Sequence, residues 1–317
     1  MEIKREIVYA RAPASVANVG VGFDVMGLAI DGLYDKVGVR ANKTGKVAIL
    51  KIEGDDGKLP LASDKNVASH VVGEFLKKID STVGVDVFLE KGVPLSSGLG
   101  SSAASACAAV VAVNALFGEP FAKEDLIGLA MQGEILVSGA AHADNVAPSL
   151  LGGLILIPSV DPLDVIKLPY NGELTCIVVH PRIEINTIDA RAILPENINL
   201  RQAVKQWGGL AGFVASLYRG DFGKLGHYLQ DFIIEPVRKG LIPGFSDVKQ
   251  AAIKAGAIAC SISGSGPTLF ALTLDHDKAP GIAEAMKEAF GRVDLQSTTH
   301  ISKINREGTQ VITNETI

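Results

Sequence analysis

The amino-acid sequence predicts an α+β fold built from two domains, and three observations carry this prediction. At 317 residues the chain is long enough for two separate hydrophobic cores. Its first half groups strand-like segments ahead of consecutive helices, and its second half begins with a new buried strand at residues 174–180. Residues 158–170, with three prolines and two aspartates, have the composition of a linker. We therefore expect domains at residues 1–165 and 166–317.

The composition describes a globular protein. Charged residues make up 21% of the chain and hydrophobic residues 47%, with a net charge of -5, so nucleic acid is not an expected partner. Residues 1–6 carry charges of both signs, and the apolar runs fall short of the ~20 residues that a membrane helix needs. We expect a cytoplasmic protein without a secretory signal or membrane partner. Three scattered cysteines among apolar neighbours predict buried thiols: Cys107, Cys176 and Cys260.

The first ninety residues predict a sheet and one helix. Residues 13–24 are typical of a loop, because proline, asparagine and closely spaced small residues break both periodicities. A helix capped by Asp64 is expected to run to Ile79, since its apolar residues fall on one face. The strand-like segments are residues 7–12, 25–39, 47–52 and 83–90. A meandering sheet is the simplest arrangement of these strands.

Residues 93–113 follow that sheet, and the rest of the chain is organised around them. Gly98 and Gly100 stand among four serines and lead into an alanine-rich run of high helix propensity. Glycine lets the backbone approach a ligand closely, and a helix N-terminus offers unpaired N–H groups, so this arrangement attracts phosphate. The Walker A lysine is missing from this loop.

Gly98 to Ala103 also fits the G-x-G-x-x-G/A dinucleotide fingerprint. That fingerprint requires a strand after its helix, whereas residues 123–137 have helical spacing and predict a second helix. A nicotinamide-dependent oxidoreductase is therefore a distant alternative. The purely structural alternative is a serine-rich cap on a buried helix.

The second half predicts another sheet flanked by helices. Strand-like segments lie at residues 152–157, 174–180, 257–262, 268–274 and 293–302, and helical segments at 186–191, 202–229, 245–255 and 280–290. A second glycine-rich loop, residues 263–267, joins two of the strands and could form an anion-binding nest or an ordinary turn. The polar tail from Glu307 is expected to be loosely held.

Several polar residues outside the glycine loops could carry chemistry. Ser102 and Glu134 offer the hydroxyl and carboxylate oxygens that Mg²⁺ takes. Arg191 and Arg238 could each bind a substrate carboxylate through two hydrogen bonds. Further candidates are His142, Asp144 and Asn145, set between apolar segments, and Asn18 and Asp24 in the first loop. Taken singly, each of these residues also has an ordinary structural explanation, as a surface charge or a turn residue.

Three motifs in sequence order make the chain resemble the GHMP kinase superfamily. Residues 94–104, P-L-S-S-G-L-G-S-S-A-A, are similar to its phosphate-binding motif, residues 13–24 to its N-terminal substrate motif, and residues 261–268 to its C-terminal glycine motif. Matches at residues 142–148, Arg191 and 236–238 point to the branch that phosphorylates homoserine. The resemblance covers nearly the whole chain. It implies an N-terminal domain like ribosomal protein S5 domain 2 and a C-terminal ferredoxin-like domain, with the active site between them.

The resemblance further implies ATP-dependent phosphorylation of the L-homoserine hydroxyl, giving O-phospho-L-homoserine on the route to threonine, with Mg²⁺ as cofactor and a possible homodimer. It assigns the nucleotide to Asn66, for adenine, and to Pro94, Leu95, Ser96, Ser97, Gly98, Leu99, Gly100, Ser101 and Ser102. Magnesium would be held by Ser102 and Glu134. The implied substrate contacts are Asn18, Asp24, His142, Asp144, Arg191, Arg238 and Gly264, and the implied catalytic residues are Asn18, Asp144 and Asn145.

One departure from the wider superfamily affects the mechanism. Mevalonate kinases and their relatives carry a lysine in the first motif and an aspartate that can act as base, whereas this chain has Ser15 and Asn145 at the corresponding positions. Asp144 could accept the hydroxyl proton or bind the substrate ammonium group. Our hypothesis is catalysis by alignment, magnesium and the helix dipole without a general base. A kinase for another small alcohol and a catalytically silent nucleotide sensor are the alternatives.

Overall fold

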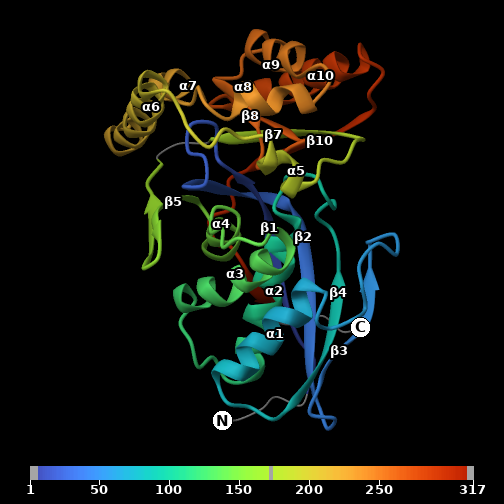
Figure 1. Cartoon of the computed structure of the whole chain (residues 1–317). Helices are drawn as coiled ribbons and strands as arrows, with labels where there is room; N and C mark the ends of the chain where they lie inside the picture. Colours follow the sequence, from blue (N-terminus) through green and yellow to red (C-terminus); the bar gives the residue numbers. More distant parts are fainter. Residues whose placement is uncertain (1–5, 171–173, 313–317) are drawn as a thin grey trace.

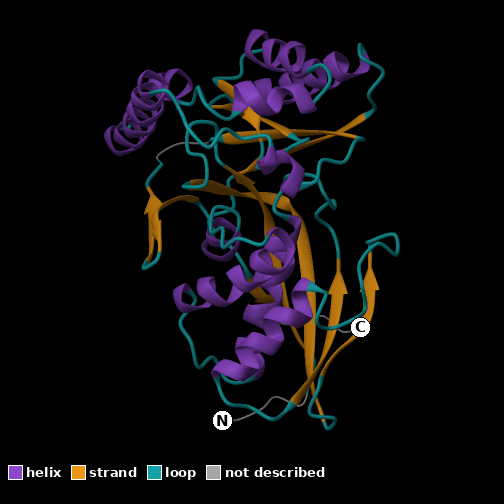
Figure 2. Ribbon diagram, in the orientation of Figure 1, coloured by secondary structure: helices purple, strands orange, loops and turns teal. Residues whose placement is uncertain are grey.

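A computed structural model describes residues 6–170 and 174–312, and it shows two stacked lobes (Figure 1). The larger lobe contains a 7-stranded sheet with helices α1 to α4, and the smaller lobe contains a 4-stranded sheet with α8 to α10 above it (Figure 2). This arrangement confirms the two-domain α+β fold. The strands are β1 (Val8–Ala17), β2 (Met26–Asn42), β3 (Val47–Glu53), β4 (Gly84–Glu90), β5 (Leu154–Val160), β6 (Leu163–Leu168), β7 (Thr175–Pro181), β8 (Ala259–Ile262), β9 (Leu269–Thr273), β10 (Ser297–Lys303) and β11 (Gln310–Ile312).

Most helices lie close to the segments that the apolar spacing predicts. The short helices at residues 146–151 and 235–238 were not predicted, and the expected helical segment at residues 202–229 is broken after Arg219. They are α1 (Val67–Lys78), α2 (Ser101–Leu116), α3 (Ile127–Ser138), α4 (Val146–Leu151), α5 (Thr187–Ala192), α6 (Leu200–Arg219), α7 (Leu225–Tyr228), α8 (Glu235–Arg238), α9 (Phe245–Lys254) and α10 (Ala279–Gly291). Short 3-10 turns precede α3, α7 and α10, and a further one follows α8. The cap of α1 is Asn66 rather than the expected Asp64, since its side chain accepts a hydrogen bond from the Ala68 amide.

The larger sheet is not a simple meander. Its order is β11-β1-β2-β4-β3, and β5 and β6 extend it beside β2. β1, β2 and β4 pair antiparallel, but β3 and β4 are parallel, and α1 crosses between them. The meander prediction was wrong here because a helix of twelve residues can return the chain to the same end of the sheet.

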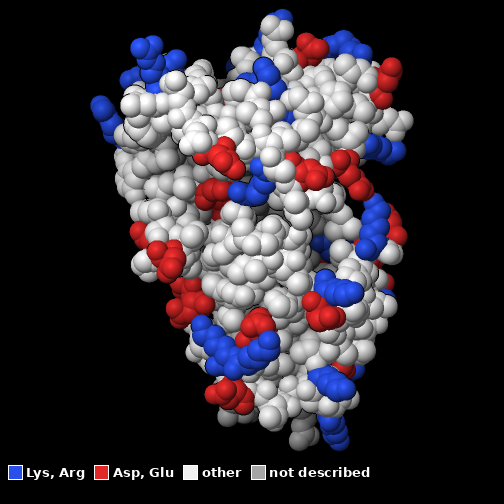
Figure 3. Space-filling model, in the orientation of Figure 1, with Lys and Arg blue, Asp and Glu red and all other residues white. Residues whose placement is uncertain are grey.

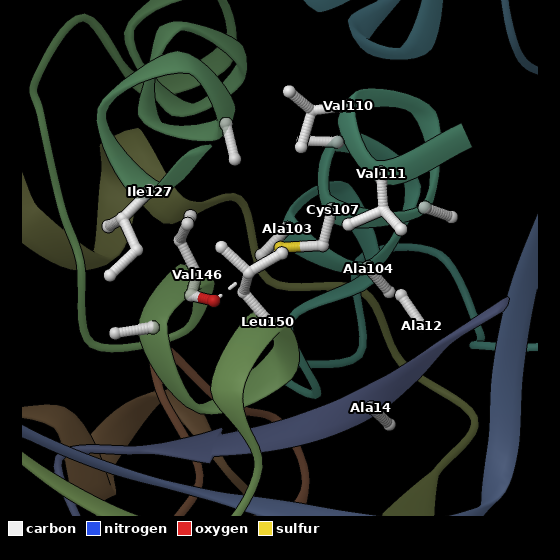
Figure 4. Close-up of a cluster of buried hydrophobic side chains, with 14 of the residues drawn as sticks. Ala12, Ala14, Ala103, Ala104, Cys107, Val110, Val111, Ile127, Val146 and Leu150 are labelled. Atoms are coloured by element: carbon white, nitrogen blue, oxygen red, sulfur yellow. Dashed lines mark hydrogen bonds between the residues drawn. The ribbon is translucent and has the colours of Figure 1, made fainter. Parts of the chain in front are cut away.

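Helix α2 is the centre of the larger lobe. Every residue from Ala103 to Leu116 is buried, so α2 has no solvent face. Its small side chains allow the sheet and the neighbouring helices to approach closely, as Figure 4 shows around Cys107. The Cys107 thiol donates to the carbonyl of Val146 over 3.4 Å. All three cysteines are free and buried, as the sequence predicts.

The smaller lobe has the ferredoxin-like arrangement. Its strand order is β10-β7-β9-β8, with all pairs antiparallel. Helices lie between β7 and β8 and between β9 and β10, which gives the β-α-β-β-α-β succession. Its core is a second cluster of buried residues that includes Phe245, Ala271 and Phe290. The fold of this lobe agrees with the expectation.

The prediction of a linker at residues 158–170 was wrong. β5 and β6 form an antiparallel hairpin there, with Leu154 opposite Leu168. Pro162 lies in the turn of this hairpin, and Pro158 lies within β5 where the pairing register shifts between Leu156 and Ser159. The expected domain division after residue 165 therefore falls inside β6. We propose that the division lies after Leu168 instead.

Two other segments also differ from the expectation. β1 continues through Ala17 into the expected loop at residues 13–24, because a register shift between Pro13 and Ser15 accommodates the proline. The tail is held rather than loose as far as Ile312. Thr309 bonds to Leu150 and Ser149, and β11 pairs with β1.

None of the helices in residues 6–170 and 174–312 is long and apolar enough to cross a membrane. On the face drawn in Figure 3, acidic and basic side chains are interspersed over both lobes.

Candidate active site

A cavity of about 380 Å³ is lined by residues of both lobes. Seventeen of the nineteen residues that the sequence singled out line it: Asn18, Asp24, Asn66, Leu95, Ser96, Ser97, Gly98, Gly100, Ser101, Ser102, Glu134, His142, Asp144, Asn145, Arg191, Arg238 and Gly264. Pro94 and Leu99 do not line this cavity. Pro94 faces an adjacent hollow, and Leu99 belongs to the hydrophobic core. Residues up to 246 positions apart in sequence are therefore brought to one place.

The first glycine loop has the backbone geometry of a phosphate cradle. Gly98 and Gly100 have φ of 79° and 66°, and a Cβ on Gly100 would lie 2.1 Å from the Ser15 hydroxyl oxygen. Ser96 also has a positive φ, of 52°. α2 begins at Ser101 without a side-chain cap, so its first amides are available to an anion.

The second glycine loop packs directly on the first. The Ser263 hydroxyl donates to the Gly98 carbonyl over 2.7 Å, and a Cβ on Gly98 would lie 2.4 Å from the Ser263 carbonyl oxygen. The Gly264 carbonyl accepts hydrogen bonds from Asn18 Nδ2 at 2.9 Å and from Arg238 Nη1 at 2.9 Å. In this structure Gly264 therefore orients two other site residues.

Ser102 and Glu134 lie side by side, one on α2 and the other on α3. The Ser102 hydroxyl donates to Glu134 Oε1 over 2.6 Å. Burial raises the pKa of the Glu134 carboxyl, against the opposing effect of the Ser102 hydrogen bond. A hydroxyl beside a desolvated carboxylate is a donor set that suits a hard divalent cation.

Asp24 and Arg191 form an ion pair across the cavity. Arg191 donates from Nη1 to Asp24 Oδ2 at 3.0 Å and from Nη2 to Oδ1 at 2.7 Å. Its Nη2 is also 3.4 Å from His142 Nδ1. Burial, and then the nearby Arg191 charge, lowers the pKa of His142, so the neutral imidazole is favoured.

Arg238 is a buried cation beside that pair. It donates from Nε to the Ala190 carbonyl at 3.1 Å, and its guanidinium lies 5.2 Å from the centre of the Phe23 ring. The Arg191 guanidinium lies 5.5 Å from the same ring. Burial, followed by repulsion from Arg191, lowers the pKa of Arg238. Two guanidinium groups thus lie against one aromatic ring in the cavity lining.

Asp144 and Asn145 immediately precede α4 and have different environments. Burial, reinforced by Asp24 and Glu134, raises the pKa of the Asp144 carboxyl to about 7. The Asn145 side-chain oxygen accepts a hydrogen bond from the Ser15 hydroxyl at 2.8 Å. Ser15 is fully buried, so its hydrogen bond fixes the orientation of Asn145.

Asn66 lines the cavity while it caps α1. Its side-chain oxygen accepts from the Ala68 amide at 3.0 Å, and Nδ2 donates to the Pro60 carbonyl at 3.1 Å. The Asn66 side chain is therefore rigidly held next to the cavity.

Sequence reasoning missed a buried ion pair beneath the first glycine loop. Lys91 bonds to Asp35, to the Ser101 carbonyl at 2.9 Å and to the Ser105 hydroxyl at 2.9 Å, and its side chain is 2% exposed. Burial lowers the pKa of Lys91, with Asp35 opposing that effect. The only signal in the sequence was an aspartate inside a predicted strand and a lysine just ahead of the loop. Thr187 and the Lys58 and Glu184 pair also line the cavity and were missed, whereas Ser265 lines it as part of the second glycine loop.

No group of three or more His, Cys, Asp or Glu side chains that could hold a metal is found among residues 6–170 and 174–312. A magnesium ion at Ser102 and Glu134 would therefore need further oxygen ligands from a bound phosphate or from water.

The fold and the phosphate cradle define a kinase of the GHMP type. The chain matches the family described as "GHMP kinases N terminal domain" over residues 66–153 and "GHMP kinases C terminal" over residues 213–292. With the full-length relatives described next, these matches show that the chain belongs to the GHMP kinase family.

Within that family, similar proteins are homoserine kinases. The chain is 46% identical to the homoserine kinase of Chloroherpeton thalassium and 45% identical to that of Chlorobium phaeobacteroides, covering 95% of this chain and 98% of each relative. The crystal structure of homoserine kinase from Cytophaga hutchinsonii superposes with a TM-score of 0.94 at 47% identity, covering 98% of this chain and 99% of that one. The mevalonate kinase of L. major, at 16% identity and a TM-score of 0.69, shares the fold.

Proposed function

We infer that this protein is a homoserine kinase, an enzyme that transfers the γ-phosphoryl group of ATP to the side-chain hydroxyl of L-homoserine. The product is O-phospho-L-homoserine, an intermediate of threonine biosynthesis. The observation that carries this function is the meeting of two features in one cavity: a phosphate cradle on α2, and an acidic and two basic side chains that match a zwitterion. Homoserine kinases that are similar over nearly the whole chain support the same substrate.

We propose that the nucleotide lies along the first glycine loop. The phosphates would bind the amides of the loop and of the first turn of α2, which carry the positive end of the helix dipole. Asn66 gives one amide proton to Pro60, and its second would reach the adenine. Pro94 and Leu99 would act by shaping the loop rather than by direct contact.

Mg²⁺ fits Ser102 and Glu134, because the two side chains supply hard oxygen donors 2.6 Å apart. When bound, the ion would neutralise charge on the transferred phosphoryl group. Glu134 would be ionised in that state, since a nearby cation offsets the burial that now raises its pKa.

The substrate would lie between Asp24 and the two arginines. Asp24, with Asp144 nearby, would bind its ammonium group, while Arg191 and Arg238 would bind its carboxylate. Asn18, held by Gly264, and neutral His142 would complete the walls of the site. This assignment rests on charge matching: a zwitterionic amino acid needs both signs, and a sugar needs neither.

We propose that phosphoryl transfer proceeds mainly by alignment and electrostatic stabilisation. Asn145, oriented by Ser15, would position the acceptor hydroxyl, and its amide cannot take up a proton. Asp144 has a carboxyl whose pKa of about 7 also suits a base, so its variants decide between the two mechanisms.

The reaction is proposed to take place in the cytoplasm, where ATP is available. The homodimer that the family resemblance implies also stays a proposal. α6 offers a surface for it, because exposed apolar or small residues recur along one face: Leu200, Val204, Trp207, Ala211, Ala215 and Tyr218. Light scattering of the purified protein measures the mass, and Trp207→Asp should lower it if this face is the interface.

A coupled ADP-release assay with Mg-ATP tests the function. L-Homoserine, mevalonate, galactose and no acceptor are compared, and we expect turnover selective for L-homoserine. Turnover with another alcohol would leave the phosphate site in place and refute the assignment of the arginines. ADP release without any acceptor-dependent increase would favour a nucleotide sensor.

A further inference from the structure

The two side chains that match opposite charges of the substrate bind each other in the free site. Asp24 lies between β1 and β2 in the larger lobe, and Arg191 lies on α5 in the smaller lobe. Their two hydrogen bonds, of 2.7 and 3.0 Å, have the parallel geometry of a carboxylate on a guanidinium. Both side chains are 29% exposed and both line the cavity. Neither charge can therefore reach a ligand fully while this pair is closed.

Some polar groups around this ion pair have no hydrogen-bond partner in the described structure. Arg191 Nε and His142 Nε2 are buried polar atoms without a hydrogen-bond partner in the described structure. Arg238 adds a second guanidinium against the same Phe23 ring, with Nε and Nη1 engaged by backbone carbonyls. The free site therefore has donors that an incoming carboxylate could satisfy, provided that Arg191 turns away from Asp24.

We propose that the Asp24 and Arg191 ion pair is a placeholder for the substrate's own charges and determines specificity for zwitterions. The proposal rests on the proposed function and deepens it. When L-homoserine binds, its carboxylate replaces Asp24 on Arg191 and its ammonium group replaces Arg191 on Asp24. Two charge-assisted contacts break and two form, so the exchange leaves no charge unpaired.

A singly charged alcohol cannot complete this exchange. 4-Hydroxybutyrate lacks the ammonium group, so it would take Arg191 and leave Asp24 without a partner at a half-buried position. 3-Aminopropan-1-ol lacks the carboxylate and would leave Arg191 unpaired. Removing one partner of a desolvated pair reduces binding by about 100-fold or more. The pair thus rejects both analogues by the same physical effect, although each retains the reacting hydroxyl.

The test is a gain of activity. With wild-type protein, kcat/KM for each analogue should lie at least about 100-fold below that for L-homoserine. Asp24→Asn frees Arg191, so kcat/KM for 4-hydroxybutyrate should rise about tenfold above the wild-type value while L-homoserine falls. Asparagine tolerates the positive φ of 60° at this position. Arg191→Gln should show the mirror-image gain for 3-aminopropan-1-ol.

Glu184→Gln is the matched control for simple electrostatics. It also removes a negative charge from the cavity lining, at a residue outside the proposed substrate contacts. A general charge effect would raise 4-hydroxybutyrate turnover equally in both variants and would overturn the proposal. If the wild-type protein phosphorylates L-homoserine but Asp24→Asn shows no gain with 4-hydroxybutyrate, the proposal is overturned and the proposed function stands. If the wild-type protein does not phosphorylate L-homoserine, the proposed function falls and the proposal falls with it.

Discussion

Replacing Asp144 with asparagine should stabilise the free protein, and increasingly so as the pH rises. The Asp144 carboxyl has a pKa of about 7 in the folded chain against 3.8 for an unperturbed group, because burial disfavours its charged form. Between these values the folded state binds a proton that the unfolded state has lost. The contribution of Asp144 to stability therefore falls from about pH 4 to pH 7 and is then constant.

The size of the effect follows from that shift. A difference of about three pKa units, at about 1.4 kcal/mol each, corresponds to about 4 kcal/mol of destabilisation above pH 7. Asparagine does not titrate and has nearly the same shape. From pH 5 to pH 8 the advantage of Asp144→Asn should grow by about 3 kcal/mol, which is about 4 °C in Tm for a chain of this size.

Thermal unfolding of both proteins without ligands, at pH steps from 5 to 8, measures this effect. Asp221→Asn, at an exposed surface ion pair, is the control and should show no such trend. A Tm difference between Asp144→Asn and wild type that stays constant over this range would refute the argument that burial holds this carboxyl partly protonated.

The same variant separates two roles for Asp144 in catalysis. If the carboxylate binds the substrate ammonium group, KM for L-homoserine rises by about 10- to 100-fold with kcat largely kept. If it accepts the hydroxyl proton, kcat falls by about 10²-fold or more with affinity intact. The second result would contradict the mechanism without a general base.

Three further variants test other parts of the site. Gly100→Ala should abolish ATP turnover and lower Tm, because its Cβ would lie 2.1 Å from a hydroxyl oxygen, whereas Gly128→Ala, with nothing within 4 Å, should keep activity and gain up to about 1 kcal/mol. Glu134→Gln should raise the Mg²⁺ concentration for half-maximal activity at least about tenfold without lowering Tm, since burial already disfavours the charged form. Lys91→Met should cost about 3 to 5 kcal/mol in urea unfolding by leaving Asp35 buried and unpaired, and adding Asp35→Asn should restore part of it; no loss in the single variant would contradict the ion pair's role.

The sequence predicts most helices and strands because the residues of each have a strong preference for one type of secondary structure. The alanine-rich run at residues 101–116 can only be a buried helix, and the strands from Met26 to Asn42 and from Thr175 to Pro181 are rich in apolar, β-forming residues. Failures occurred where small or polar residues are buried by tertiary contacts. β1 continues through Ser15 because α2 packs on it, and the tail is held as far as Ile312 because Thr309 bonds to Ser149 of α4. Local pattern contains no information about such partners.

Sequence motifs identified the candidate site residues, but they did not predict which of these side chains bond to one another. The order of the three motifs indicated which residues gather, and nearly all of them line one cavity. Composition and spacing could not show that Asp24 bonds Arg191 over 167 positions, or that Lys91 and Asp35 meet beneath the loop. These contacts depend on how the two lobes pack and on the register in which β2 and β4 pair.

Backbone strain adds an argument that no sequence pattern could supply. Asn18, Val19, Asp24 and Ser96 all have positive φ, and three of the four line the cavity. Val19, at 44°, is β-branched and fully buried, so this conformation is costly for it by about 1 to 3 kcal/mol. The surrounding structure must hold this turn in place, as the Asn18 bond to Gly264 and the Asp24 bond to Arg191 do from the opposite lobe. Those partners come from the smaller lobe. The packing of the two lobes therefore also fixes the strained turn between β1 and β2, and with it the geometry of the substrate site.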